Sequence, residues 1–149
     1  MIIDPSALVA ILLGEADAPA FARAIAGARS RRLSAASYVE LASVIDGRRN
    51  PVLSGALDAT LASSGIEIVA LTPQQARLAR EAYQRFGRGS GHPAQLNMGD
   101  CFAYALARDL REPLLFKGGD FALTDIELVT EPDRRKRLSD VVAGYAARS

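Results

Sequence analysis

Five acidic residues lie beside apolar runs or where a predicted element begins or ends. They are Asp4, Glu40, Asp100, Asp120 and Asp125. Carboxylates brought close together repel one another and raise each other's pKa, and a divalent cation relieves that repulsion. Mg²⁺ and Mn²⁺ prefer oxygen ligands, and Mg²⁺ keeps several of its waters. Such a site can generate hydroxide, polarise a phosphodiester and stabilise the leaving oxygen. The set therefore predicts metal-dependent phosphodiester hydrolysis, provided that the fold brings the carboxylates together.

Each of these residues also has an ordinary structural interpretation. Asp4 is suited to cap a helix that begins at the next residue, and Asp100 is suited to cap its own helix. Glu40 fits the rim of an amphipathic helix. Asp120 and Asp125 fit turns. Taken one at a time, the residues leave both interpretations open, and the hypothesis of a site depends on the set.

The rest of the composition excludes several other kinds of chemistry. The chain has 149 residues, a net charge of +1 and 49% hydrophobic residues, which is typical of one globular domain. Its single cysteine, Cys101, excludes an internal disulfide and a zinc site built from cysteines, and fits a reducing cytoplasm. Its single histidine, His92, excludes a mechanism that needs two imidazoles. We expect no secretory signal and no membrane-spanning helix, because no apolar run approaches about 18 residues.

Strands and helices are predicted to alternate along the chain. Predicted strands cover residues 1–3, 33–35, 66–70, 113–116 and 126–129. Predicted helices begin at Pro5 and cover 18–28, 37–49, 51–64, 73–86, 99–110 and a basic C-terminal stretch from Pro132 to about Ala147, with a glycine-rich loop over 87–93. This alternation predicts an α/β fold with a mostly parallel sheet covered on both faces. Ligands of such sheets bind at the carboxyl ends of the strands, where Asp4 lies.

Four segments together resemble the PIN-domain family of VapC toxins. They are residues 2–12 (IIDPSALVAIL), 34–40 (SAASYVE), 96–107 (LNMGDCFAYALA) and 112–126 (EPLLFKGGDFALTDI). The resemblance covers residues 1–129 in order and spacing. It implies a three-layer α/β/α PIN-like fold with a mostly parallel central sheet. We therefore expect a PIN domain over residues 1–130 and, within the same domain, a basic helical extension over 131–149.

The resemblance also implies a function. It is that of a magnesium-dependent endoribonuclease, with Mn²⁺ as a substitute, in a type II toxin–antitoxin system. The expected substrate is structured RNA, either tRNA or rRNA. The expected partners are a VapB-type antitoxin and a second copy of the chain in a homodimer, in the cytoplasm and away from membranes.

The resemblance assigns roles to individual residues. Asp4 and Asp100 correspond to the principal metal ligands, and Glu40 to a glutamate that completes the pocket or orients water. Asp120 corresponds to the last acidic position, with Asp125 as a further support. We expect Ser6 to support Asp4 through a hydrogen bond.

One departure from the family pattern weakens the last acidic position. Relatives in this branch commonly have an acid where this chain has Gly119, which leaves Asp120 alone there. The main alternative is therefore a degenerate PIN-like module that binds antitoxin or RNA without cleaving. A receiver domain is disfavoured, because Asp4 is followed by Pro5 rather than by a second acid.

Three basic residues are candidates for RNA contacts. Arg85 and Arg88 enter the glycine-rich loop, and Lys117 follows the strand predicted over 113–116. Phosphate contacts by arginine and lysine supply most sequence-independent RNA affinity. A solvated surface is the alternative interpretation for all three.

Overall fold

The computed structural model describes residues 1–129, in which helices and parallel strands alternate. Four short strands form one sheet in the order β3-β2-β1-β4, and every neighbouring pair is parallel. The strands are β1 (Ile2–Ile3), β2 (Arg32–Ser34), β3 (Glu67–Val69) and β4 (Leu114–Leu115). The helices are α1 (Pro5–Leu12), α2 (Ala18–Gly27), α3 (Ala35–Asp46), α4 (Pro51–Ser63), α5 (Pro73–Phe86), α6 (Met98–Leu110) and the 3₁₀ turn η1 (Asp120–Leu123). The helix predicted from Pro132 and the extension over 131–149 lie outside the described residues.

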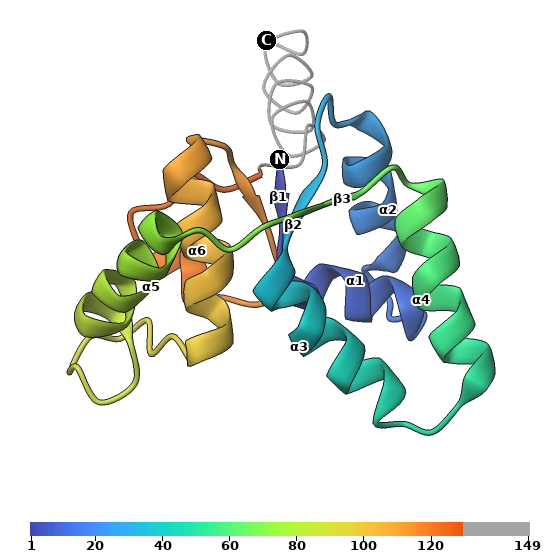
Figure 1. Cartoon of the computed structure of the whole chain (residues 1–149), viewed down its shortest axis with the longest axis horizontal. Helices are drawn as coiled ribbons and strands as arrows, with labels where there is room; N and C mark the ends of the chain where they lie inside the picture. Colours follow the sequence, from blue (N-terminus) through green and yellow to red (C-terminus); the bar gives the residue numbers. More distant parts are fainter. Residues whose placement is uncertain (130–149) are drawn as a thin grey trace, which may run out of the picture.

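Helices cover both faces of the sheet (Figure 1). Helices α5 and α6 lie on one side, and α1 to α4 lie on the other. Successive strand residues point to opposite faces, so Ile2 and Leu114 pack in the core beneath α5 and α6, while Ile3 and Leu115 pack in the core of α1 to α4. This arrangement confirms the predicted three-layer α/β fold.

Three of the helices begin with the same local signal. A capping residue whose side chain accepts a backbone hydrogen bond is followed by proline at the first helical position, where the missing N–H has no cost. The pairs are Asp4 with Pro5, Asn50 with Pro51, and Thr72 with Pro73. The first pair ends β1 and begins α1 within one residue, which fixes Asp4 at the carboxyl end of the strand.

Two predicted elements differ from the structure. Helix α3 covers Ala35–Asp46 instead of 37–49, because it follows β2 without a connecting loop and ends before Gly47. The predicted strand over 126–129 is wrong, since this segment makes only an isolated parallel bridge between Leu114 and Leu128. Leu114 alone pairs with it, through hydrogen bonds of 2.9 Å to Glu127 and 3.0 Å from Val129.

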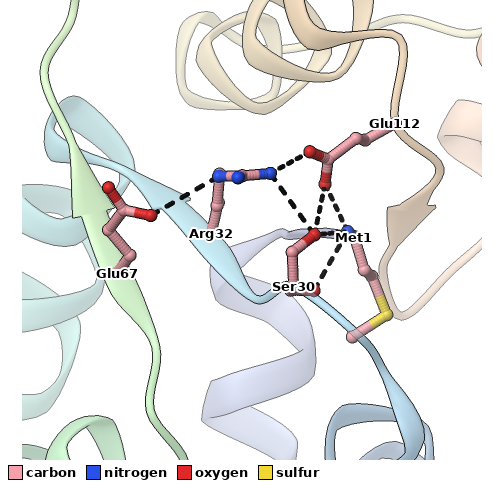
Figure 2. Close-up of polar contacts among 5 residues, drawn as sticks. All are labelled: Met1, Ser30, Arg32, Glu67 and Glu112. Carbon is pink, nitrogen blue, oxygen red and sulfur yellow. Dashed lines mark hydrogen bonds and ion pairs between the residues drawn. The ribbon is translucent and has the colours of Figure 1, made fainter.

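An ion-pair cluster joins the amino ends of the four strands (Figure 2). The Glu112 carboxylate, before β4, pairs with the Met1 ammonium group and with Arg32 of β2. The Ser30 hydroxyl donates a 3.0 Å hydrogen bond to Glu112, and Arg32 lies 3.5 Å from Glu67 of β3. Burial alone would raise the pKa of Glu112, but hydrogen bonds from the Met1 ammonium and Ser30 hold it below its usual value. Opposite charges therefore neutralise each other at this end of the sheet.

No helix within residues 1–129 is long and apolar enough to cross a membrane.

Candidate metal and catalytic site

Asp4 is the most buried acid of the candidate site. It lies at the end of β1 with 5% of its surface exposed, and its N–H donates a 2.9 Å hydrogen bond to Leu115 of β4. The Ser6 N–H donates a 2.9 Å hydrogen bond to Asp4 Oδ2, so Asp4 caps α1 as well. Burial is the largest cause that raises the pKa of Asp4 to about 7, and the charges of Asp100 and Glu40 add to it. The capping interpretation of Asp4 is therefore confirmed.

Asp100 lies in the first turn of α6 and is held there by a capping box. The Asp100 N–H donates a 2.8 Å hydrogen bond to Asn97 Oδ1, and the Asn97 N–H donates a 2.9 Å hydrogen bond to Asp100 Oδ2. This reciprocal pair fixes the orientation of the carboxylate. Burial is the largest cause that raises the pKa of Asp100, and the nearby charge of Asp120 raises it further.

Glu40 projects from α3 toward the start of α6. A Cβ atom added to Gly99 would lie 2.2 Å from Glu40 Oε2 and 2.6 Å from Oε1, so the carboxylate lies directly against the backbone of α6. Glu40 Oε2 is buried and has no hydrogen-bond partner among the described residues. Burial first, and then the charge of Asp100, raise the pKa of Glu40.

Asp120 reaches the site from the loop after β4. Gly118 has a φ of +110°, a conformation that favours glycine, and this turn leads the chain from β4 into η1, whose first residue is Asp120. Asp120 is exposed, and its charge acts on Asp100. Gly119 has an ordinary negative φ of −110° and open space around its Cβ position, so its backbone does not require glycine.

The structure thus brings the four predicted acids together. The four acids belong to different segments: Asp4 follows β1, Glu40 lies in α3, Asp100 in α6 and Asp120 in η1. Besides burial, the charges of Asp100 and Glu40 raise the pKa of Asp4, and the charge of Asp100 raises that of Glu40. The charge of Asp120 in turn raises the pKa of Asp100. We call these four residues the acidic cluster. Three of them, Asp4, Glu40 and Asp100, have raised pKa values, first because they are buried and then because other carboxylates lie nearby.

The acidic cluster fits a hydrated divalent cation. Its donors are all carboxylate oxygens, which suit Mg²⁺ or Mn²⁺, and one of them, Glu40 Oε2, is buried with no hydrogen-bond partner within residues 1–129. Within residues 1–129, no three Asp, Glu, His or Cys side chains are close enough to enclose a single metal ion. Mg²⁺ in proteins is commonly held by one or two carboxylates and several waters, so such an enclosure is not needed. Asp4 and Asp100 are the residues suited to hold the ion.

Ser6 joins Asp4 to the end of β4. Besides its amide bond to Asp4, its hydroxyl oxygen accepts a 2.9 Å hydrogen bond from the Lys117 N–H. The amide and the hydroxyl of Ser6 both act to lower the pKa of Asp4 against the larger effect of burial. Ser6 therefore lies where the sequence predicts a supporting residue.

Asp125 is not part of the acidic cluster, which corrects its expected role beside Asp120. The Tyr104 hydroxyl donates a 2.6 Å hydrogen bond to Asp125 Oδ1, while Arg108 and Arg85 lie 3.2 Å and 3.4 Å from Oδ2. Burial opposes, but the Tyr104 hydrogen bond and the two guanidinium groups hold the pKa of Asp125 below its usual value. The carboxylate is thus neutralised in a separate network that joins α5, α6 and the last described segment.

The three basic candidates differ in their surroundings. Arg88 is exposed, and its positive charge acts to lower the pKa of Asp100, so it lies beside the acidic cluster. Arg85 pairs with Asp125 and lies 4.6 Å from the centre of the Phe86 ring. Lys117 pairs with Glu15 and, at 3.2 Å, with Asp17. Of the three, Arg88 is the one whose charge faces the acidic cluster.

Several residues around the cluster were not identified from the sequence. Asn97 orients Asp100, and the spacing Asn97-x-x-Asp100 is the signal that identifies a capping box. Ser34 and Ser37 are fully buried, and their hydroxyls have no partner within the described chain. The pairing of Ile2 with Arg32 sets Ser34 level with Asp4 on the neighbouring strand. No sequence pattern distinguishes these two serines from ordinary helix-capping residues.

Comparisons with known proteins agree with this geometry. The family model described as "PIN domain" matches residues 1–127. Ribonuclease VapC28 of Mycobacterium tuberculosis is 57% identical over 127 residues, which cover 85% of this chain and 96% of the relative. Ribonuclease VapC of Mycolicibacterium smegmatis is 48% identical over 129 residues, which cover 87% of this chain and 99% of the relative.

Two solved structures share the fold at low sequence identity. VapC20 of Mycobacterium tuberculosis, described as a sarcin–ricin loop cleaving toxin, matches with a TM-score of 0.69 at 18% identity, over 86% of this chain and 97% of that one. A toxin–antitoxin complex from Klebsiella pneumoniae matches with a TM-score of 0.65 at 19% identity, over 87% of this chain and 96% of that one. Family model, sequence relatives and fold point the same way: the chain belongs to the PIN-domain family, in its VapC branch.

Proposed function

We propose that the protein is a magnesium-dependent endoribonuclease toxin of a type II toxin–antitoxin system. The observation that carries this proposal is the acidic cluster, in which burial first, and then the charges of neighbouring carboxylates, raise the pKa values of Asp4, Glu40 and Asp100. The relatives named as VapC ribonucleases support RNA as the substrate.

The roles of the residues follow from their positions. Asp4 and Asp100 would hold Mg²⁺, since each is fixed by a cap bond to one of its carboxylate oxygens. A bound Mg²⁺ supplies polarisation of the phosphodiester and stabilisation of the leaving oxygen. Glu40 and Asp120 would accept hydrogen bonds from the attacking water and orient it for in-line attack. Ser6 keeps Asp4 in place, and Arg88 contacts an RNA phosphate beside the cluster.

The substrate and the partners are proposed at the level of class. Structured RNA, either tRNA or ribosomal RNA, is the proposed substrate, and the fold neighbour described as cleaving the sarcin–ricin loop is consistent with it. A VapB-type antitoxin is the proposed inhibitor, in line with the toxin–antitoxin complex among the fold neighbours. We propose a homodimer acting in the cytoplasm, and we expect Arg85 and Lys117 to contact RNA only after exchanging their present carboxylate partners.

Cleavage assays with matched variants test the proposal. Purified protein is incubated with total tRNA or with ribosomal RNA, in Mg²⁺, in Mn²⁺ and in EDTA. We expect cleavage in either metal, none in EDTA, and a loss of at least about 100-fold in Asp4→Asn and Asp100→Asn. Asp58→Asn, which changes an exposed acid on α4, is the matched control and should cleave like the wild type. Full activity in Asp4→Asn or Asp100→Asn would contradict the proposed mechanism.

The degenerate PIN-like module remains the second candidate, because this chain has Gly119 at a position where the resemblance to this branch implies an acid. The Cβ position of Gly119 is open, so Gly119→Asp can be made without a clash. If the wild type binds RNA or antitoxin but does not cut, and Gly119→Asp cuts, then the degenerate module is correct. Cleavage by the wild type itself dismisses it.

A further inference from the structure

We propose that Gly99 is a positioning residue for Glu40, since its missing side chain makes the space in which the Glu40 carboxylate lies. A Cβ atom at this position would lie 2.2 Å from Oε2, 2.6 Å from Cδ and 2.6 Å from Oε1. All three distances are far shorter than any real contact between such atoms. The carboxylate of Glu40 therefore occupies the volume that any other residue at position 99 would fill.

Glycine has no other evident reason to be at this position. Gly99 lies in the first turn of α6, directly after Met98, and is not among the residues with positive φ. Glycine within a helix is less favourable than alanine because it loses more conformational freedom on folding. Gly99 lowers helix stability and is not required by the backbone conformation. Its presence is best explained by the space that it leaves for the Glu40 carboxylate.

The atoms that would clash decide what a substitution does. They belong to the end of a flexible side chain and not to backbone, so Glu40 can rotate away while α3 and α6 stay in place. Alanine at position 99 should thus leave the fold intact and move the carboxylate out of the acidic cluster. The inference rests on the proposed function only for the catalytic consequence of that movement.

The chain offers a matched control. Gly55 lies within α4, and its Cβ position has no atom within 4 Å. Gly55→Ala makes the same change of residue type in a helix without approaching the cluster. Both Gly99→Ala and Gly55→Ala should unfold at the same temperature as the wild type or higher.

The first arm of the test is structural and needs no activity. Crystal structures of metal-free Gly99→Ala, Gly55→Ala and wild type should show the Glu40 carboxylate displaced in Gly99→Ala alone. A Gly99→Ala structure in which Glu40 keeps its position would overturn the inference, whether or not the protein cuts RNA. This arm therefore separates failure of the inference from failure of the proposed function.

The second arm is a double-mutant cycle on RNA cleavage and on Mn²⁺ binding. Gly99→Ala should lower the cleavage rate by about 100-fold, the size of effect that a misplacement of about 1 Å can cause. In the Glu40→Ala background, Gly99→Ala should have no further effect on either readout, because the residue it displaces is gone. Gly99→Ala combined with Glu40→Asp should recover part of the loss, because the shorter side chain avoids the new methyl group. Independent, additive losses would show that Gly99 acts by another route and would overturn the inference.

Discussion

The Asp4 carboxyl group is almost fully buried and has a pKa near 7, about three units above that of a free aspartate. In the unfolded chain its pKa is close to 3.8, the ordinary value for an aspartate. Between these two values the folded protein holds a proton that the unfolded chain has released. The free energy of unfolding contributed by Asp4 therefore falls as pH rises from about 4 to about 7, and no more is lost at higher pH.

This difference predicts that Asp4→Asn, compared with wild type, raises the free energy of unfolding of the metal-free protein more at pH 8 than at pH 5. The gain over wild type should grow by about 3 kcal/mol across that interval, because about two pH units separate pH 5 from the folded pKa of about 7 and each corresponds to about 1.4 kcal/mol. Denaturant unfolding in EDTA at pH 5 and pH 8 measures it, and Asp58→Asn serves as the control. A constant difference between Asp4→Asn and wild type at both pH values would show that Asp4 does not carry this shift.

Asp4, Asp100 and Glu40 could be chosen from the sequence because acids next to apolar runs are conspicuous. Asp125 is predicted from the sequence as a support for Asp120, but it is neutralised by Tyr104, Arg85 and Arg108, and such partners far apart in sequence are fixed only by the fold. The space at Gly99 was also invisible, because a sequence does not show which side chain fills the place of a missing Cβ.

The Tyr104–Asp125 hydrogen bond predicts a stability effect without a catalytic one. Tyr104→Phe removes a 2.6 Å hydrogen bond to a carboxylate and should cost about 1.5–3 kcal/mol of unfolding free energy. RNA cleavage by the folded variant should stay within about twofold of wild type, a change well under 1 kcal/mol in the barrier. A large loss of cleavage in a folded Tyr104→Phe variant would show that Asp125 supports catalysis after all.

The ion-pair cluster at the amino ends of the strands predicts a contrast between two glutamates. The Glu112 carboxylate contacts the Met1 ammonium, the Ser30 hydroxyl and Arg32, with 20% of its side chain exposed, whereas Glu67 is 67% exposed and 3.5 Å from Arg32. Glu112→Ala should cost about 2 kcal/mol, and Glu67→Ala less than about 0.5 kcal/mol. Because the pKa of folded Glu112 is lowered, its contribution is present at neutral pH and is lost as pH falls through that lowered value.

Thermal or denaturant unfolding of both variants at pH 7 and pH 3 checks this contrast. The Glu112→Ala deficit should be smaller at pH 3 than at pH 7, because the unfolded chain takes up the proton before the folded protein does and the stabilisation by Glu112 declines. Equal effects of the two substitutions at pH 7 would show that the cluster does not stabilise the strand ends.

The starts of α1, α4 and α5 were predictable because proline and capping side chains are local signals, whereas strand lengths were not. The apolar run at 66–70 has the composition of a long strand, yet β3 covers three residues, because it lies at the edge of the sheet and pairs only with β2. The segment 126–129 fails as a strand because β4 offers it one residue for pairing. Strand length is set by partners distant in the chain.

For the molecule as a whole, the alternation of strands and helices was enough to predict a parallel sheet with helices on both faces. It did not reveal how the cluster is divided between the two hydrophobic cores. Glu40 belongs to α3, whose Leu41 and Ile45 pack in the core of α1 to α4. Asp100 and Asp120 neighbour Cys101 and Phe121, which pack in the core beneath α5 and α6.

Magnesium binding is therefore expected to stabilise the whole molecule. At a concentration 100 times the dissociation constant, a ligand that binds only the folded state adds about 2.7 kcal/mol to the free energy of unfolding. Thermal unfolding with increasing Mg²⁺ measures it, and Asp100→Asn should remove most of the increase. An equal increase in wild type and Asp100→Asn would indicate nonspecific ion binding.

The shortness of the sheet has a mechanical consequence. Strands of two or three residues give the α5–α6 layer and the α1–α4 layer little backbone in common, and Glu40 and Asp100 belong to helices of different layers. A cation bound by Asp4 and Asp100, with Glu40 beside it, would hold the two layers in one relative position. Amide hydrogen exchange in both layers should then slow together when the ion is added, although only one small spot on the surface is occupied.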